Sequence, residues 1–345
     1  MFKLKKNSLI WFIAISMVML AINSEEIIKA VKDALSLCAS AVIPSLFPFM
    51  VLSAMFVSNA PNNFFGFAGR IFKKLFGISA FCVPALICGL VCGYPIGAKC
   101  TCELYKAKKI SASEAESLIA YSNNSGPLFV IGAVGVGMFG SAKAGIMLYA
   151  IQIFSALSCG FILKRFTIGR FSSSVTPEST QGEFTDFVCS SALNMLNICA
   201  FIVFFAVVNC LLKPLYDILP DFARLIAVCV PEVTNALVVI SKGDFEKDIL
   251  LSLASFALGF SGLCVHMQVK SIIKDLGLSM KKYYLSRCFI ALYSMIVTYL
   301  FLHAKDDIGL FLCSHRLGFG ICIFFALLLI FGKQKKRKNF SSSFD

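Results

Sequence analysis

The hydrophobic and polar positions of this chain form long apolar runs separated by short polar segments. A helix that crosses a bilayer needs about 20 mainly apolar residues, and most of these runs approach or exceed that length. We expect spans at residues 9–22, 35–57, 142–163, 187–212, 289–303 and 308–331. The pattern therefore predicts an all-α polytopic membrane protein.

One apolar run, residues 81–98, is interrupted in a way that an ordinary spanning helix is not. Gly89, Gly93 and Gly97 recur every four residues, which would give one helix face three bare backbone patches for close packing. Pro95 removes an amide donor and should break or kink the helix. Backbone groups freed inside a membrane need partners in protein, water or a solute. This run is our first candidate for a binding site, and a kinked packing helix without a ligand is the alternative.

Two apolar runs in the second half of the chain are interrupted as well. Residues 219–240 carry Glu232 in their middle, where a carboxylate is costly enough to indicate function, with a lysine or water partner as the alternative. Residues 250–269 contain two glycines followed by polar residues, as residues 81–98 do. Interrupted segments at corresponding places of two halves are the best sequence pointer to a transporter-like site. We therefore expect two repeat-like halves with broken or re-entrant helices.

A polar cluster at residues 121–127, with the sequence YSNNSGP, directly precedes the glycine-rich apolar run 129–140. Pro127 suits the first turn of a helix, so we expect a helix that begins at membrane depth. Unpaired amides and hydroxyls at such a helix start could hold an anionic or polar solute. A solvent-exposed turn between two spans is the alternative.

Shorter signals predict the remaining segments. Residues 59–79 alternate apolar with basic side chains, which is typical of a helix lying along a surface of anionic headgroups. Ser111 and Glu114 fit a capping box at a helix start. The basic N-terminus before residues 9–22 fits a cleaved signal peptide or an uncleaved signal anchor, and we prefer the anchor because the rest is membrane protein. A Ser/Thr/Pro-rich segment at 171–182 predicts a linker.

Positive charge predicts the topology. The chain is 58% hydrophobic and 15% charged with a net charge of +13, and its mean hydropathy is +0.82. Basic clusters mark the cytoplasmic side of a membrane protein. Placing every cluster inside makes the two halves parallel, and inverted halves with one cluster outside are the alternative. The expected divisions are a signal-anchor span with a polar connector (1–33), a first membrane repeat (34–170), the linker (171–182), a second membrane repeat (183–332) and a basic cytoplasmic tail (333–345).

The composition also argues against several kinds of site. Most of the 15 cysteines lie in apolar runs without a CxxC motif, so we expect packing residues rather than disulfides. The three histidines are far apart, and HExxH and GxSxG motifs are absent. We therefore expect no enzyme activity, no metal and no cofactor. The basic surface indicates contact with anionic lipid and not with nucleic acid.

Several motifs carry a family resemblance. They are PSLFPFMVLS (Pro44–Ser53), CGYPIGAK (Cys92–Lys99), SASEAE with YSNNSGPLFVIGAVGVGMFG (Ser111–Gly140), PEVTNA (Pro231–Ala236) and GFSGLCVHMQV (Gly259–Val269). In these motifs the chain resembles the YlbJ family of sporulation integral membrane proteins, which are similar in turn to the Gate domains of nucleoside-transporter relatives. The resemblance implies an endospore-forming bacterium, its cytoplasmic or forespore membranes, and a role in spore cortex formation.

Residues and resemblance together predict a transporter of a small polar or anionic solute, with a non-transporting scaffold that recruits sporulation proteins as the alternative. The expected partners are the solute, the lipid bilayer, and a second copy or other sporulation membrane proteins. In a transporter, helix starts and Lys99 would balance anionic groups, and Glu232 or His266 would carry a coupling proton. The candidate substrate-binding residues are Gly93, Tyr94, Pro95, Gly97, Lys99, Ser122, Asn123, Asn124, Ser125, Pro127, Glu232, Thr234, Asn235, Ser261, His266 and Gln268.

Overall fold

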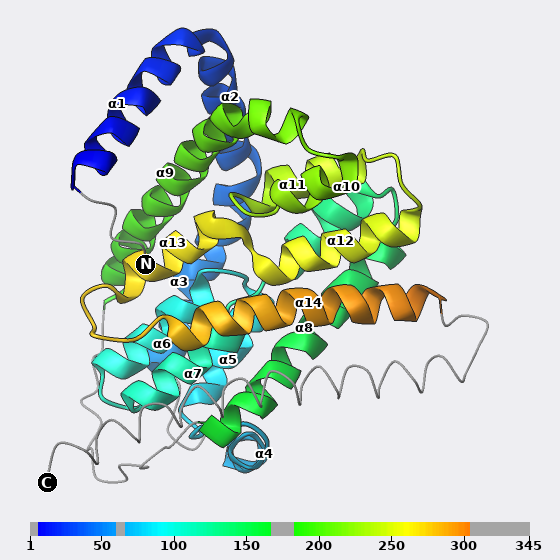
Figure 1. The fold of residues 1–345 in the computed structure, drawn as a ribbon. Coiled ribbons are helices and arrows are strands. Elements are labelled where there is room, and N and C mark those ends of the chain that lie inside the picture. Colours follow the sequence, from blue (N-terminus) through cyan, green and yellow to red (C-terminus); the bar gives the residue numbers. More distant parts are fainter. Residues whose placement is uncertain (1–5, 60–65, 167–182, 304–345) are drawn as a thin grey trace, which may run out of the picture.

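A computed structural model describes residues 6–59, 66–166 and 183–303, and every regular element within these ranges is a helix (Figure 1). Helices α8 (Ala142–Leu163), α9 (Phe184–Asp217) and α14 (Lys281–His303) are long and apolar enough to cross a membrane, and Lys247–Ile273 is a fourth such segment. A bent helix pair near the N-terminus can form a fifth. The prediction of an all-α polytopic membrane protein is confirmed.

The other helices are shorter. The N-terminal region contains α1 (Lys6–Ile22), α2 (Ser24–Leu37), the π-helical turn η1 (Cys38–Val42), α3 (Ile43–Asn59) and α4 (Gly66–Phe76). The middle region contains α5 (Cys82–Val91), α6 (Ile96–Lys106), α7 (Ala112–Ser122), η2 (Leu128–Met138) and η3 (Lys164–Phe166). The last region contains α10 (Asp221–Ala227), α11 (Val233–Ser241), α12 (Lys247–Phe260) and α13 (Gly262–Ile273). The predicted linker, the span at 308–331 and the basic tail lie outside the described residues.

The capping box predicted at Ser111 and Glu114 is confirmed, and the expected span at 35–57 contains a bend. The span containing Pro44 and Pro48 is bent by 49° between α2 and α3, and Pro44 lies in the first turn of α3. At the start of α7 the backbone amide of Glu114 donates to the Ser111 hydroxyl, and the Glu114 carboxylate accepts from the Ser111 amide. This capping box fixes where α7 begins.

The run at residues 81–98 breaks between α5 and α6, and the chain doubles back there. In a continuous helix, Gly89 and Gly97 would be separated by about 12 Å of rise. Instead, a Cβ atom built on Gly89 would lie 2.9 Å from the Cα atom of Gly97. The break that Pro95 predicts is therefore present. The expectation that the glycines share one helix face is wrong, because they face each other across the break.

The break between α7 and η2 packs against this hairpin. The Ser122 carbonyl lies between Gly89 and Gly97, so close that a Cβ atom on either glycine would overlap its oxygen. Gly93, at a φ of +88°, packs on Gly126, whose backbone nitrogen would lie 2.8 Å from a Cβ atom. The two broken helices can cross this closely because glycine has no side chain at the contact.

The second half of the chain contains a matching crossing. A short break separates α10 from α11, and Ser261, in the left-handed conformation, separates α12 from α13. The amide of Leu263 donates to the carbonyl of Val230 at 2.7 Å. The amide of Cys264 donates to the carbonyl of Pro231 at 2.9 Å. Each break thus satisfies backbone groups that the other leaves free.

Contacts between helix ends define two ends of the bundle. At one end, Lys282 lies 3.6 Å from Glu116, which places the start of α14 beside the start of α7. At the same end, the Lys164 ammonium donates to the Lys74 carbonyl, and the Ser79 amide donates to Glu114 at 3.0 Å. This end therefore gathers α4, the starts of α5, α7 and α14, and the end of α8.

The opposite end gathers α10, the α11–α12 connection and the end of α14. His303 lies 4.0 Å from Asp248, and the ring centroids of Phe222 and Phe245 are 6.1 Å apart. The α10–α11 segment therefore starts and finishes at this end, whereas the α5–α6 hairpin starts and finishes at the other. In Figure 1 these two hairpins accordingly lie on different sides of the bundle.

The two halves are therefore inverted, and the parallel arrangement expected from charge is wrong. Of the two interrupted runs in the second half, residues 221–241 form the re-entrant segment, while 247–273 crosses the bundle. The described parts of the basic clusters at 70–74, 164–170 and 270–287 still gather at one end. For these three clusters, the inverted arrangement therefore places none of the described basic residues at the opposite end.

We predict that Gly89→Ala destabilises the folded protein, because the added methyl group meets the Ser122 carbonyl and cannot be relieved by a rotamer change. Overpacking of this kind costs about 1–3 kcal/mol. The matched control is Gly137→Ala, whose Cβ atom would meet only a carbonyl oxygen at 3.6 Å. Thermal unfolding of both purified variants measures the difference. Equal unfolding midpoints would contradict the crossing.

Candidate solute-binding site

A cavity of about 530 Å³ lies where the two crossings face each other; we call it the inner cavity. The start of α3, η2 and α9 contribute mainly apolar side chains to it. A largely apolar pocket with a few convergent polar groups is the usual form of a small-molecule site. The predicted site residues that line the inner cavity are Gly93, Tyr94, Ser125, Glu232, Thr234 and Gln268.

The polar cluster at residues 121–127 lies deep in the bundle. Ser122, Asn123 and Asn124 are fully buried and Ser125 is 1% exposed, so the alternative of a solvent-exposed turn is wrong. Ser125 reaches the inner cavity beside Tyr94, and the other three lie behind it. Within the described residues the Ser122 hydroxyl has no hydrogen-bonding partner, and Ser125 and Asn123 have only the nearby phenols of Tyr94 and Tyr283, respectively, beside them. Buried groups of this kind are costly, which marks the cluster as a place for a polar ligand or water.

Glu232 caps the N-terminus of α11. Its two carboxylate oxygens accept hydrogen bonds from the amides of Thr234 at 2.8 Å and Asn235 at 2.7 Å. The hydrogen bonds and the helix dipole both favour a negative charge at this position. The start of helix α11 is therefore the partner of the Glu232 carboxylate. The alternative partners, a lysine or a water molecule, are not required to explain its burial.

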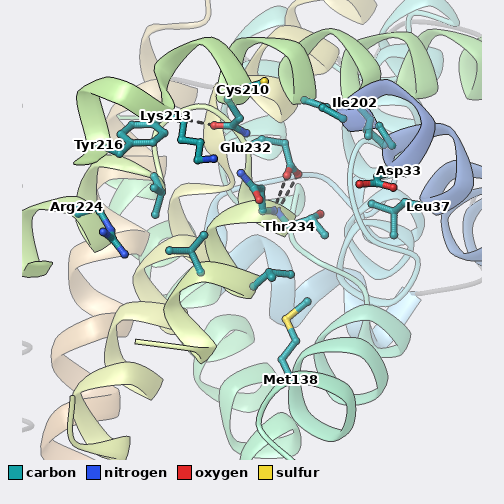
Figure 2. Close-up of a pocket in the computed structure, with 18 of the residues that line it drawn as sticks. Asp33, Leu37, Met138, Ile202, Cys210, Lys213, Tyr216, Arg224, Glu232 and Thr234 are labelled. Carbon is teal, nitrogen blue, oxygen red and sulfur yellow. Dashed lines mark hydrogen bonds between the residues drawn. The ribbon is translucent and has the colours of Figure 1, made fainter. Parts of the chain in front are cut away.

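Glu232 also lines a second cavity, of about 590 Å³, which we call the outer cavity (Figure 2). The outer cavity lies between α2, α9, α10 and α11, toward the end opposite the basic clusters. Figure 2 shows the Glu232 carboxylate in it, with Asp33 and Lys213 on the helices to either side. Arg224 also lines it and lies 4.0 Å from Asp217. Glu232 and Thr234 line both cavities, so they mark the boundary between a charged and an apolar space.

Lys99 does not reach the inner cavity. Its ammonium is buried and donates to the hydroxyl of Ser191 on α9 at 3.2 Å. It lines a much smaller pocket that also contains Gln268 and Pro95. Because Gln268 lines both spaces, it lies between Lys99 and the inner cavity.

His266 lies outside both cavities, in an aromatic enclosure. Its Nδ1 atom is 3.2 Å from the Tyr283 hydroxyl, and the rings of Phe260, Tyr283 and Tyr284 meet it edge-on. The structure therefore does not bring His266 together with Glu232. Within the described ranges, no three His, Cys, Asp or Glu side chains converge as metal ligands would.

The other predicted residues support the backbone or line the outer cavity. Asn235 is exposed and lines only the outer cavity. Gly97 packs on the Ser122 carbonyl, and the Ser261 hydroxyl donates to the Leu258 carbonyl at 3.1 Å. Neither these two nor Pro127, which precedes η2, lines the three cavities described above.

Arg287 is a polar residue of this region that the sequence reasoning missed. It ends the basic cluster at 270–287, which charge alone would place at the membrane surface, yet its side chain on α14 is fully buried. Its burial could have been predicted from its position: Arg287 comes immediately before the apolar run 289–303, about one helical turn after the polar loop ends. Tyr283, on the same helix, lies beneath its guanidinium.

Comparisons with known proteins agree with the motifs. No family model and no solved structure matches the chain. The chain is 28% identical to the sporulation integral membrane protein YlbJ of Bacillus subtilis (strain 168) over an alignment of 310 residues, which covers 78% of this chain and 76% of that protein. The likeness confirms the resemblance predicted above: this is a multi-pass membrane protein related to the YlbJ family of sporulation integral membrane proteins.

Proposed function

We propose that the protein transports a small polar or anionic solute across a bacterial cytoplasmic or forespore membrane, and that this solute is needed for spore cortex formation. The observation that carries the proposal is the meeting of two inverted helix crossings at one cavity. Inverted repeats with broken helices at the midplane are a common transporter architecture. The sporulation role is taken from the name of the related protein.

The two adjoining cavities support a transport route. The outer cavity approaches the end that carries Asp33, Asp217 and Arg224, and the inner cavity lies between the crossings. Glu232 lies at their junction, with its carboxyl oxygens hydrogen-bonded to backbone amides at the start of α11. A carboxylate at such a junction can exchange a proton with water in the outer cavity, which makes Glu232 our candidate for the coupling residue.

A scaffold that recruits other sporulation proteins is the competing function. Close glycine contacts and buried amides also occur in bundles that only pack. A scaffold has no requirement for an open inner cavity, however, so substitutions that fill this cavity separate the two functions.

The first test fills the inner cavity. Gly132 of η2 lines it, and a Cβ atom there would meet only a Leu128 side-chain atom at 4.0 Å. We expect Gly132→Leu to lower solute uptake about tenfold or more, since about 1.4 kcal/mol of lost binding suffices for that. Proteoliposomes are incubated with a small-molecule extract of sporulating cells, and their contents are compared by mass spectrometry with those of protein-free vesicles.

The control for that test is Gly137→Leu, on the same helix but exposed and away from the cavities. It should take up solute as the unmodified protein does. If neither the unmodified protein nor the control accumulates any component, while Gly132→Leu still restores heat-resistant spores to a deletion strain, a scaffold is the better account.

The second test concerns coupling. Glu232→Gln keeps the shape of the side chain but cannot ionise, and it loses one of two cap hydrogen bonds at a stability cost of about 1 kcal/mol. We expect a pH gradient to stop accelerating uptake, while uptake without a gradient persists. Glu246→Gln is the matched control, because Glu246 precedes α12 without a side-chain cap bond. Unaltered pH-driven uptake in Glu232→Gln would remove the coupling role.

A further inference from the structure

Arg287 is the most fully buried charged side chain near the proposed site. It is 0% exposed and lies on α14, where that helix packs against α7 and α8. Its Nη2 atom donates to the Ala120 carbonyl, near the end of α7, at 3.1 Å. Its guanidinium carbon lies 5.6 Å from the centroid of the Tyr283 ring.

These contacts leave much of the guanidinium without partners. The Nε and Nη1 atoms of Arg287 have no hydrogen-bonding partner within the described residues. No carboxylate in this part of the chain forms an ion pair with it either. The ionisable groups near enough to influence its charge include the phenols of Tyr283 and Tyr94, the thiol of Cys159 and the ring of His266.

An arginine in this situation keeps its charge. The guanidinium stays protonated in proteins, so it cannot escape the cost of burial by losing a proton. The end of α7 supplies the equivalent of about half a negative charge. The Tyr283 ring adds a cation–π attraction. Together these offset only part of the cost, because a buried charge requires a full counter-charge and hydrogen bonds to its remaining donors.

The surroundings of Arg287 contain further polar donors. The buried Asn123 amide faces the phenol of Tyr283, whose ring lies against the guanidinium, and the Ser122 hydroxyl is buried without a hydrogen-bonding partner in the described chain. Both residues follow closely on Ala120, to which Arg287 is hydrogen-bonded. Neutral hydroxyl and amide donors beside a guanidinium are the set of groups that an oxyanion requires.

Tyr94 connects this group to the inner cavity. It lines the cavity, lies beside Ser125, and interacts with the charge of Arg287. Asn123, two residues before Ser125, faces Tyr283. Tyr94 therefore lies close both to the inner cavity and to the guanidinium, and a rotation of its side chain would bring the two into contact.

We propose that Arg287 is the anchor for a carboxylate or phosphate group of the transported solute, assisted by Asn123 and the neighbouring hydroxyls. This inference rests on the proposed transport function and narrows its substrate class to oxyanions. Solute binding would then supply the missing counter-charge, and the arginine would hold the anionic group at the crossing of α5–α6 with α7. The lysine that the sequence suggested for this task, Lys99, is instead bonded to Ser191 in its own small pocket.

The test measures anion binding without transport. Purified full-length protein in detergent is titrated with inorganic phosphate or acetate, and its thermal unfolding midpoint is recorded. A titration with chloride controls for ionic strength. We expect phosphate or acetate to raise the midpoint beyond the chloride effect, since a ligand that binds only the folded state stabilises it. In Arg287→Gln the apparent Kd should rise about tenfold or more, as expected for loss of a hydrogen bond to a charged group.

Two further variants keep the test decisive. Arg70→Gln removes an exposed arginine of α4 and should keep the full anion response. Arg287→Lys keeps the charge and should keep a weaker response. In buffer without oxyanions, Arg287→Gln should unfold at the same temperature as the unmodified protein or higher, because the uncompensated charge is gone. If Arg287 only caps α7, Arg287→Gln will instead unfold earlier in every buffer with its anion response unchanged, which overturns the proposal.

The outcomes also separate this inference from the transport function. An Arg287-dependent anion response without any uptake into vesicles would uphold the anion site and contradict transport. Uptake that persists in Arg287→Gln, with an unchanged anion response, would contradict the anion site and leave transport standing. A response to short-chain phosphatidic acid but not to phosphate or acetate would indicate a lipid headgroup and would also overturn the solute site.

Discussion

The structure depends on how main-chain polar groups are satisfied where apolar helices break. A membrane interior provides no hydrogen bonds, so a broken helix is tolerated only beside protein or a water-filled space. In the second half, the start of α13 donates to the carbonyls of Val230 and Pro231. In the first half, glycines allow the α5–α6 hairpin to approach the Ser122 carbonyl and Gly126. Each break thus needs the other break of its pair, which keeps the two crossings at fixed places.

These two crossings have consequences for the site. Because the hairpins enter from opposite ends, their tips meet within the bundle and leave the inner cavity between them. Helix starts at such a place carry partial positive charge, and Glu232 already uses one of them. Arg287 adds a full positive charge close to the other crossing. The charges at the two crossings are therefore of opposite sign, which suits a solute that brings an anionic group together with a coupling proton.

The sequence predicted the interrupted segments well because each break has a local chemical cause. Pro95 predicted the break of residues 81–98, and Glu232 in the middle of residues 219–240 marked the interruption there. The sequence could not show which segment of the second half crosses the bundle, because residues 221–241 and 247–273 have similar apolarity. Only tertiary contacts, such as that between Phe222 and Phe245, distinguish a re-entrant segment from a crossing one. Arg287 was missed because a charge count cannot tell the end of a polar loop from the first buried turns of a helix.

Hydrogen–deuterium exchange of the protein in lipid nanodiscs tests the central claim most directly, namely that the buried breaks face a solvated space. The peptide that contains residues 122–126 is compared with one from the middle of α8. The account predicts that amides in the break exchange much faster than those of α8, although Ser122, Asn123 and Asn124 are fully buried. Exchange as slow as that of α8 would mean dry packing at the crossing and would contradict the account.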